Sequence, residues 1–114
     1  MAVPKNLALS SLCSGQTTPG STAWQPASGG IMVSVGTASC AYAYLPTYLT
    51  SLGGSAGQWL TTGANAIYDP ALSSFSACVR YWDGSALTPA QANANNWHLN
   101  WLALTGNTSV VRKY

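Results

Sequence analysis

The sequence predicts an all-β protein, a small antiparallel β-sandwich of about six to seven strands with an extended N-terminal arm. Several segments alternate between apolar and polar residues with period two, and clusters of glycine, proline and aspartate separate them. No long segment shows the 3.6-residue apolar period of a helix. With 114 residues, 47% of them hydrophobic, the chain has the size and composition of a single domain with its own core.

The arm is predicted over residues 1–30 and the body of the sandwich over residues 31–114. Residues 14–30 are rich in glycine, serine, threonine and proline, which is typical of a loop or an extended arm. A structureless segment of this length is uncommon in a compact domain. We therefore expect it to lie on the body or on a neighbouring copy, with Trp24 as its anchor.

The body begins with alternating apolar residues over 31–35, the first predicted strand. Pro46 interrupts the next apolar stretch, because proline lacks the N–H that a central strand donates. Further strands are predicted over residues 41–45, 47–52, 58–62 and 65–68.

The clearest strand covers residues 75–82, where Phe75 lies on one face and Arg80 and Trp82 on the other. A turn at Asp83-Gly84 ends it. Residues 85–94 are expected to be a polar loop with a short helical turn begun by Thr88-Pro89. The last strand is predicted over residues 96–104, with its tryptophans on one face.

Charged residues make up only 5% of the chain, whereas ordinary soluble domains carry about 25%. Part of the surface is therefore expected to pack on copies of the same chain. This composition favours an extracellular or virion-associated protein. The first residues, Met1–Lys5, lack the apolar stretch of a signal peptide.

Several classes of partner are not expected. The chain has no basic stripe to neutralise nucleic-acid phosphates and no run of about 18 apolar residues to insert into a membrane. The spacing of Cys13, Cys40 and Cys78 matches no metal motif, so neither a metal nor a cofactor is predicted. The cysteines form either one disulfide with an odd thiol or three reduced thiols.

Catalysis is not predicted. The only acids, Asp69 and Asp83, precede Pro70 and Gly84 and fit turn positions. His98 is the sole histidine, it falls on a strand face between asparagines, and no G-x-S-x-G motif accompanies it.

Two surfaces are candidates for binding sugars, which require aromatic platforms and short polar side chains. Arg80, Trp82 and Asp83 form the first, at a strand end, and Asn96 and His98 belong to the second. Trp82 has an alternative role in a subunit interface. The remaining aromatic residues exceed what one small core holds, so some are expected to be buried only in an oligomer. The candidates for that interface are Trp24, Tyr42, Tyr44, Tyr48 and Trp59.

The spacing of Tyr68, Phe75 and Trp82, followed by the closing segment Asn100-Trp101-Leu102-Ala103, resembles the H-type lectins and the related β-sandwich tips of phage tail fibres. Ala66 and Asp83 stand where the lectins have an arginine and a histidine that contact galactose-type sugars. The resemblance implies a trimer or a multiple of three, with ligand sites between subunits.

Two functions are consistent with these observations. The first is an oligomeric carbohydrate-recognition or adhesin module. The second is a structural, self-assembling subunit of a virion, fibre or extracellular assembly, without a small ligand.

Overall fold

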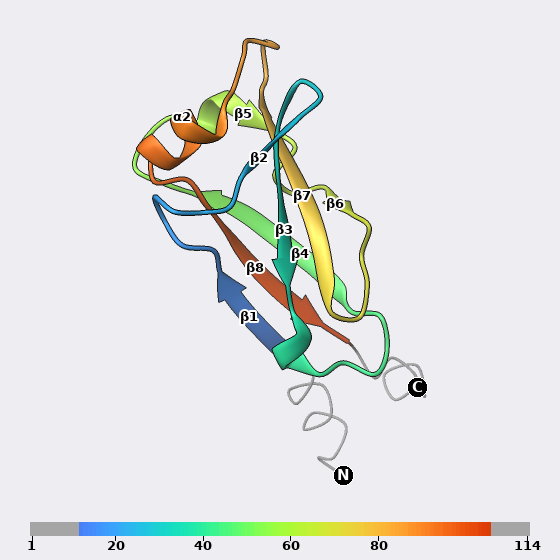
Figure 1. Cartoon of the computed structure of the whole chain (residues 1–114). Helices are drawn as coiled ribbons and strands as arrows, with labels where there is room; N and C mark the ends of the chain where they lie inside the picture. Colours follow the sequence, from blue (N-terminus) through green and yellow to red (C-terminus); the bar gives the residue numbers. More distant parts are fainter. Residues whose placement is uncertain (1–11, 106–114) are drawn as a thin grey trace, which may run out of the picture.

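The computed structural model describes residues 12–105, and two antiparallel sheets form the framework of this part of the chain (Figure 1). The elements in chain order are β1 (Leu12–Gln16), β2 (Gln25–Ala27), β3 (Gly30–Gly36), the 3-10 turn η1 (Ala38–Cys40), β4 (Thr47–Gly53), the 3-10 turn η2 (Gln58–Leu60), β5 (Thr61–Thr62), β6 (Ile67–Tyr68), β7 (Ser74–Tyr81), α2 (Pro89–Ala94) and β8 (His98–Leu104). The all-β prediction is confirmed.

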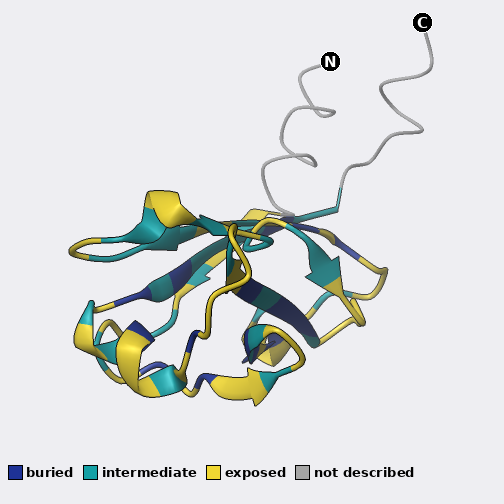
Figure 2. Cartoon of the chain, turned by 90° about the horizontal axis from the view of Figure 1, so that it is seen from above, coloured by how far each residue is buried: buried dark blue, intermediate teal, exposed yellow. Residues whose placement is uncertain are grey.

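One sheet has three strands in the order β1-β8-β4, and the other has the order β2-β3-β7-β5, with β6 also paired to β7. Buried side chains lie mainly on the strands, between the two sheets, whereas the loops are largely exposed (Figure 2). Phe75 of β7 joins the layers, because its ring lies 4.4 Å from that of Tyr48 in β4 and 6.2 Å from that of Trp101 in β8. Such aromatic pairs add to the stability that burial alone gives.

The alternation expected in the body is found in β3, β7 and β8. Ile31, Val33 and Val35 are buried, and so are Phe75 and Val79. The short helical turn is also found: α2 has Pro89 in its first turn and a capping box in which Thr88 and Gln91 exchange hydrogen bonds.

The structure differs from the predicted arm over residues 12–30. β1 pairs with β8 along its whole length, and β2 and β3 form a hairpin across the boundary drawn at residue 30. Gly15 allows the β1 pairing, since a Cβ there would lie 2.6 Å from the Trp101 ring. The remainder of the predicted arm, residues 1–11, lies outside the described residues.

The connection between β1 and β2 is held on the body by buried and polar contacts. Trp24 is 5% exposed, and its Nε1 donates to the carbonyl of Trp97 at 3.3 Å. The side chain of Asn93 in α2 exchanges two hydrogen bonds of 3.1 Å with the backbone of Thr22. The β1–β2 connection has the composition of a loop but follows a fixed path, because a side chain far along the chain makes hydrogen bonds with its backbone.

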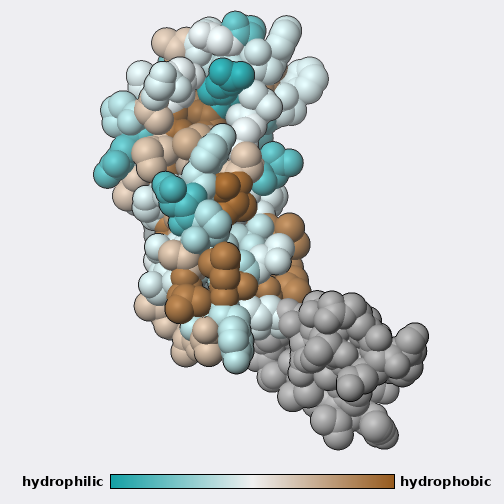
Figure 3. Space-filling view, turned by 90° about the vertical axis from the view of Figure 1, so that its right-hand side faces the viewer, coloured by the Kyte–Doolittle hydropathy of each residue, from teal (hydrophilic) through white to brown (hydrophobic). Residues whose placement is uncertain are grey.

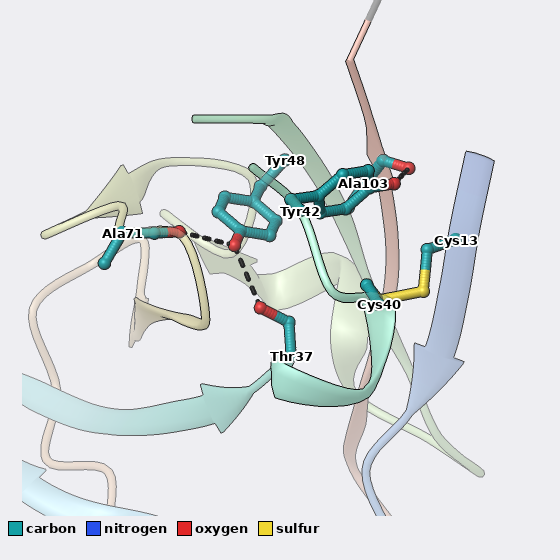
Figure 4. Close-up of a disulfide and its surroundings, with 7 residues drawn as sticks. All are labelled: Cys13, Thr37, Cys40, Tyr42, Tyr48, Ala71 and Ala103. Carbon is teal, nitrogen blue, oxygen red and sulfur yellow. Dashed lines mark hydrogen bonds between the residues drawn. A yellow bond between two sulfur atoms is a disulfide. The ribbon is translucent and has the colours of Figure 1, made fainter. Parts of the chain in front are cut away.

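Residues 41–45, expected as a strand, make no strand pairing. Ala41 takes a left-handed conformation with φ 55° at the end of η1, which turns the chain away from β3. Cys40 of η1 is joined to Cys13 of β1 by a disulfide, so one of the two cysteine alternatives is realised (Figure 4). Cys78 is a free thiol.

The hydroxyl of Tyr48 organises the same end of the sandwich. It donates to the carbonyl of Ala71 at 2.6 Å and lies 2.9 Å from the hydroxyl of Thr37, which is fully buried (Figure 4). These bonds tie β4 to the ends of β3 and of the segment before β7.

We expect Tyr48→Phe to lower the free energy of unfolding by about 1–3 kcal/mol, because the Thr37 hydroxyl and the Ala71 carbonyl lose a buried partner. Urea unfolding measures this loss. The matched control is Tyr44→Phe, at a side chain that is 79% exposed and should leave stability within about 0.5 kcal/mol. Equal effects of the two variants would contradict the role given to the Tyr48 hydroxyl.

Candidate functional site

The outer face of the five-stranded sheet carries a groove of about 520 Å³ that runs over β7. We call it the β7 groove, and its main lining residues are Ser28, Gly30, Thr62, Tyr68, Cys78 and Arg80. The residues come from four segments, because β7 pairs with β3 on one side and with β5 and β6 on the other. The volume lies within the range of about 300–1,000 Å³ that is typical of small-molecule sites.

Two glycines keep the floor of the β7 groove open. A Cβ on Gly30 would lie 2.9 Å from the Cβ of Arg80, and one on Gly63 would lie 2.9 Å from the carbonyl oxygen of Cys78. Gly63 also has φ +99°, a conformation that other residues rarely adopt. The backbone of β7 is thus approached closely from both sides, and a side chain at either glycine would collide with it.

Arg80 supplies the only lysine or arginine side chain within residues 12–105. The residue lies opposite Thr62 in the β5–β7 pairing and is exposed. Its side chain makes no hydrogen bond or ion pair with another described residue. Arg80, which the sequence places at a sugar site, therefore lines the groove as a cation whose N–H groups can bind a ligand.

Trp82 follows β7 and is 69% exposed. Its backbone N–H donates to the carbonyl of Leu60 at 2.9 Å, which continues the β5–β7 pairing by one residue. Trp59, which is 87% exposed, precedes Leu60 in η2. The fold thus brings Trp59, expected in an interface, to the same end of the sandwich as Trp82, expected in a sugar site.

Asp83 is engaged in its own turn. Its Oδ1 accepts from the backbone N–H of Ser85 at 2.9 Å and from the Ser85 hydroxyl at 2.7 Å. These two hydrogen bonds lower the pKa of the Asp83 carboxyl, so it stays ionised. The residue lies beside Trp82 but does not line the β7 groove.

Asn96 and His98 lie apart from this groove, at the start of β8 in the three-stranded sheet. Asn96 has φ 56° and donates to the hydroxyl of Ser55 at 2.9 Å. The Nδ1 of His98 lies 3.0 Å from the Asn96 carbonyl, and the ring packs against Gly53. The two predicted sugar-binding surfaces are therefore separate, on different sheets.

The five predicted interface residues have different environments. Trp24 and Tyr48 are each 5% exposed within a single chain, so neither is available to a partner. Tyr42 is half-buried and donates to the Ala103 carbonyl at 2.7 Å, while desolvation and the neighbouring Tyr48 raise its pKa. Tyr44 and Trp59 remain exposed. The small core holds more aromatic side chains than expected, because the β1–β2 connection and α2 enclose one end of it.

Sequence reasoning missed Tyr68 and Thr62 as groove residues. Tyr68 is half exposed and pairs with Ser76 on β7, two positions before Cys78 and on the same face. The alternation in the sequence places residues 76, 78 and 80 on one face of β7. It does not show which residues lie beside them, because Thr62 and Tyr68 come from β5 and β6, which have two residues each.

Exposed apolar side chains occur outside the groove as well, and Figure 3 shows hydrophobic residues gathered in the lower half of one face. On the outer face of the three-stranded sheet, Leu12 and Leu49 are each more than half exposed. Leu49 pairs with Leu102 beside a shallow hollow of about 290 Å³.

Within residues 12–105 no three or more His, Cys, Asp or Glu side chains gather as they would to hold a metal ion. No helix in this described part has the length and apolar composition needed to span a membrane. Comparison with known proteins finds no protein family, curated protein or solved structure that matches the chain.

Proposed function

We propose that this chain is a carbohydrate-recognition module that acts as an oligomer, with the β7 groove and the adjoining Trp82 as its sugar-binding surface. The observation that supports it most is the composition of the groove. An aromatic ring, a cation and hydroxyl side chains, Tyr68, Arg80, Thr62 and Ser28, line one open cavity.

The chemistry of a sugar fits these groups. A pyranose ring presents C–H patches that pack on aromatic faces, and its hydroxyls both donate and accept hydrogen bonds. Thr62 and Ser28 also donate and accept, and Arg80 donates only.

Oligomerisation is part of the proposal, because the low charge and the exposed Tyr44, Trp59 and Leu49 favour contact between copies. The resemblance to H-type lectins and tail-fibre tips favours a trimer or a multiple of three. Several copies on one particle would raise the avidity of individually weak sites.

We expect Trp82→Ala to weaken binding to a responsive glycan about tenfold, because the exposed indole loses its contact with the sugar ring. Binding is measured on a glycan array and by titration with the free sugar. Leu72→Ala is the control, an exposed apolar residue in the segment before β7, whereas Trp82 follows the other end of this strand. Unchanged binding by Trp82→Ala would place the sugar elsewhere.

The second candidate function is a structural subunit without a small ligand. The apolar outer face of the three-stranded sheet, with Leu12, Leu49 and Leu102, favours it. Light scattering and negative-stain imaging separate the candidates: a closed trimer or hexamer supports the recognition module, and a filament or shell supports the structural subunit. A stable monomer would contradict both.

A further inference from the structure

We infer that the β7 groove selects an acidic saccharide, one whose sugar ring carries a carboxylate, and that the Arg80 guanidinium is the group that recognises it. This inference rests on the proposed function, because it names the class of sugar that the same groove takes.

The first argument is that no carboxylate within residues 12–105 neutralises the positive charge of Arg80. Within residues 12–105 the only carboxylates are Asp69 and Asp83, and neither lines the β7 groove. Asp83 accepts two hydrogen bonds from Ser85 in its own turn, and Asp69 follows β6 with φ 51°. A chain that has so few charges therefore places its one described cation in the β7 groove, without an acidic partner among the described residues.

The second argument is the shape of the donor set. The guanidinium presents N–H groups in a planar fork that matches the two oxygens of a carboxylate. Gly30 opposite Arg80 has no side chain to cover the start of this arginine, and a Cβ there would be within 2.9 Å of the Arg80 Cβ. Arg80 as a whole is exposed and lines the groove, so its donors can be reached from there.

The third argument is that the groove provides for the rest of the sugar. Tyr68 stands at the β6 side and Thr62 faces Arg80 across the β5–β7 pairing. A ring held by its carboxylate at Arg80 meets an aromatic surface and a hydroxyl in the same cavity. A free inorganic anion would make no use of the Tyr68 ring, so the lining favours an anionic sugar.

The test compares sugars that differ only in charge. Multivalent glucuronic acid, its methyl ester and the matching neutral glucoside are presented to the intact protein, and binding is measured by biolayer interferometry. We expect the acid to bind at least about tenfold more tightly than the ester, and the difference to shrink as salt is raised. A sulfated glucoside forms a fourth arm, and its preference over the carboxylate would overturn the choice of anion.

Variants of Arg80 test its role in this preference. Arg80→Gln should bind acid and ester equally, and Arg80→Lys should keep part of the preference, because it keeps the charge but loses the fork. Arg112→Gln makes the same change of charge elsewhere in the sequence and should retain the wild-type preference. Circular dichroism verifies that the Arg80 variants fold. A preference that survives Arg80→Gln would overturn the assignment.

Cys78 gives a readout that does not depend on affinity measurements. It is the free cysteine among the described residues and lines the β7 groove, whereas Cys13 and Cys40 are joined. A sugar bound beside Arg80 should slow alkylation of Cys78 by a thiol reagent, and the methyl ester should slow it less.

The outcomes separate the inference from the proposed function. If acid and ester bind equally and protect Cys78 equally, the charge selectivity is wrong and the sugar site stands. Binding of sugars without protection of Cys78 would place the site outside the β7 groove. Failure of every sugar to bind under multivalent display would contradict the proposed function and the inference together.

Discussion

Trp97→Ala is expected to lower the free energy of unfolding by about 3–5 kcal/mol, the cost of deleting a large aromatic side chain from a packed core. Trp97 is fully buried, and its ring meets that of Tyr81 edge-on at 6.1 Å. Its Nε1 donates to the carbonyl of Ala56 at 2.7 Å. Removal of the indole leaves a cavity and also takes the partner from this carbonyl.

The surroundings of Trp97 have little capacity to collapse into that cavity. A Cβ on Gly54 would lie 2.5 Å from the indole Cδ1, so the chain on this side is already in close contact. The backbone carbonyl of Trp97 accepts a hydrogen bond from the indole of Trp24, and the backbone N–H of Trp97 donates to the carbonyl of Ala92 at 2.9 Å. The side chain therefore stands where β8, α2 and the β1–β2 connection meet.

Urea unfolding followed by circular dichroism measures this effect. Trp82→Ala is the control, because that indole is 69% exposed and its removal should change stability by less than about 0.5 kcal/mol. If Trp97→Ala does not fold at all, Trp97→Phe provides the comparison, since it keeps most of the packing and loses the hydrogen bond. A loss under 1 kcal/mol in Trp97→Ala would contradict the described core.

Loss of the disulfide is expected to have the second large effect, about 3–4 kcal/mol. Cys13 and Cys40 are 27 residues apart, and a loop of this length restricts the unfolded chain by an entropy of that order. The bond also joins the edge strand β1 to η1 (Figure 4). The melting temperature should fall by about 10–20 °C.

Thermal unfolding of Cys13→Ser/Cys40→Ser measures this loss, alongside the wild-type protein with and without reductant. Cys78→Ser is the control, because it removes the free thiol and leaves the bridge intact. Reductant should destabilise wild type and Cys78→Ser alike and leave the double variant unaffected. Equal melting temperatures with and without reductant in the wild-type protein would rule out a stabilising bridge.

The long strands could be predicted because their own residues carry the signal. Alternation over β3, β7 and β8 sets which side chains are buried, and no other part of the chain is needed to see it. The short strands β5 and β6 have two residues each, too few for a period, and they exist only as partners of β7. β1 and β2 lie in a segment whose glycines and prolines resemble a loop, so their pairing was not visible.

The candidate site was predictable to the same extent. The parity of β7 placed Arg80 and Trp82 on the outer face, and the structure agrees. The alternation in the sequence does not reveal that Thr62 lies opposite Arg80 or that Tyr68 belongs to the same groove, because those contacts depend on strand pairing. Asn96 and His98 showed a similar polar pattern, but they lie on the other sheet.

The lengths of the edge strands affect where copies of this chain can aggregate by strand pairing. The five-stranded sheet ends in β2, three residues with Pro26 at the centre, and in two-residue strands on its other side. Such ends offer few free N–H and C=O groups to a foreign strand. β1 and β4, of five and seven residues, have neither a proline nor a lysine to discourage pairing. Misassembly under stress, as in partial unfolding at high concentration, should therefore begin along the three-stranded sheet.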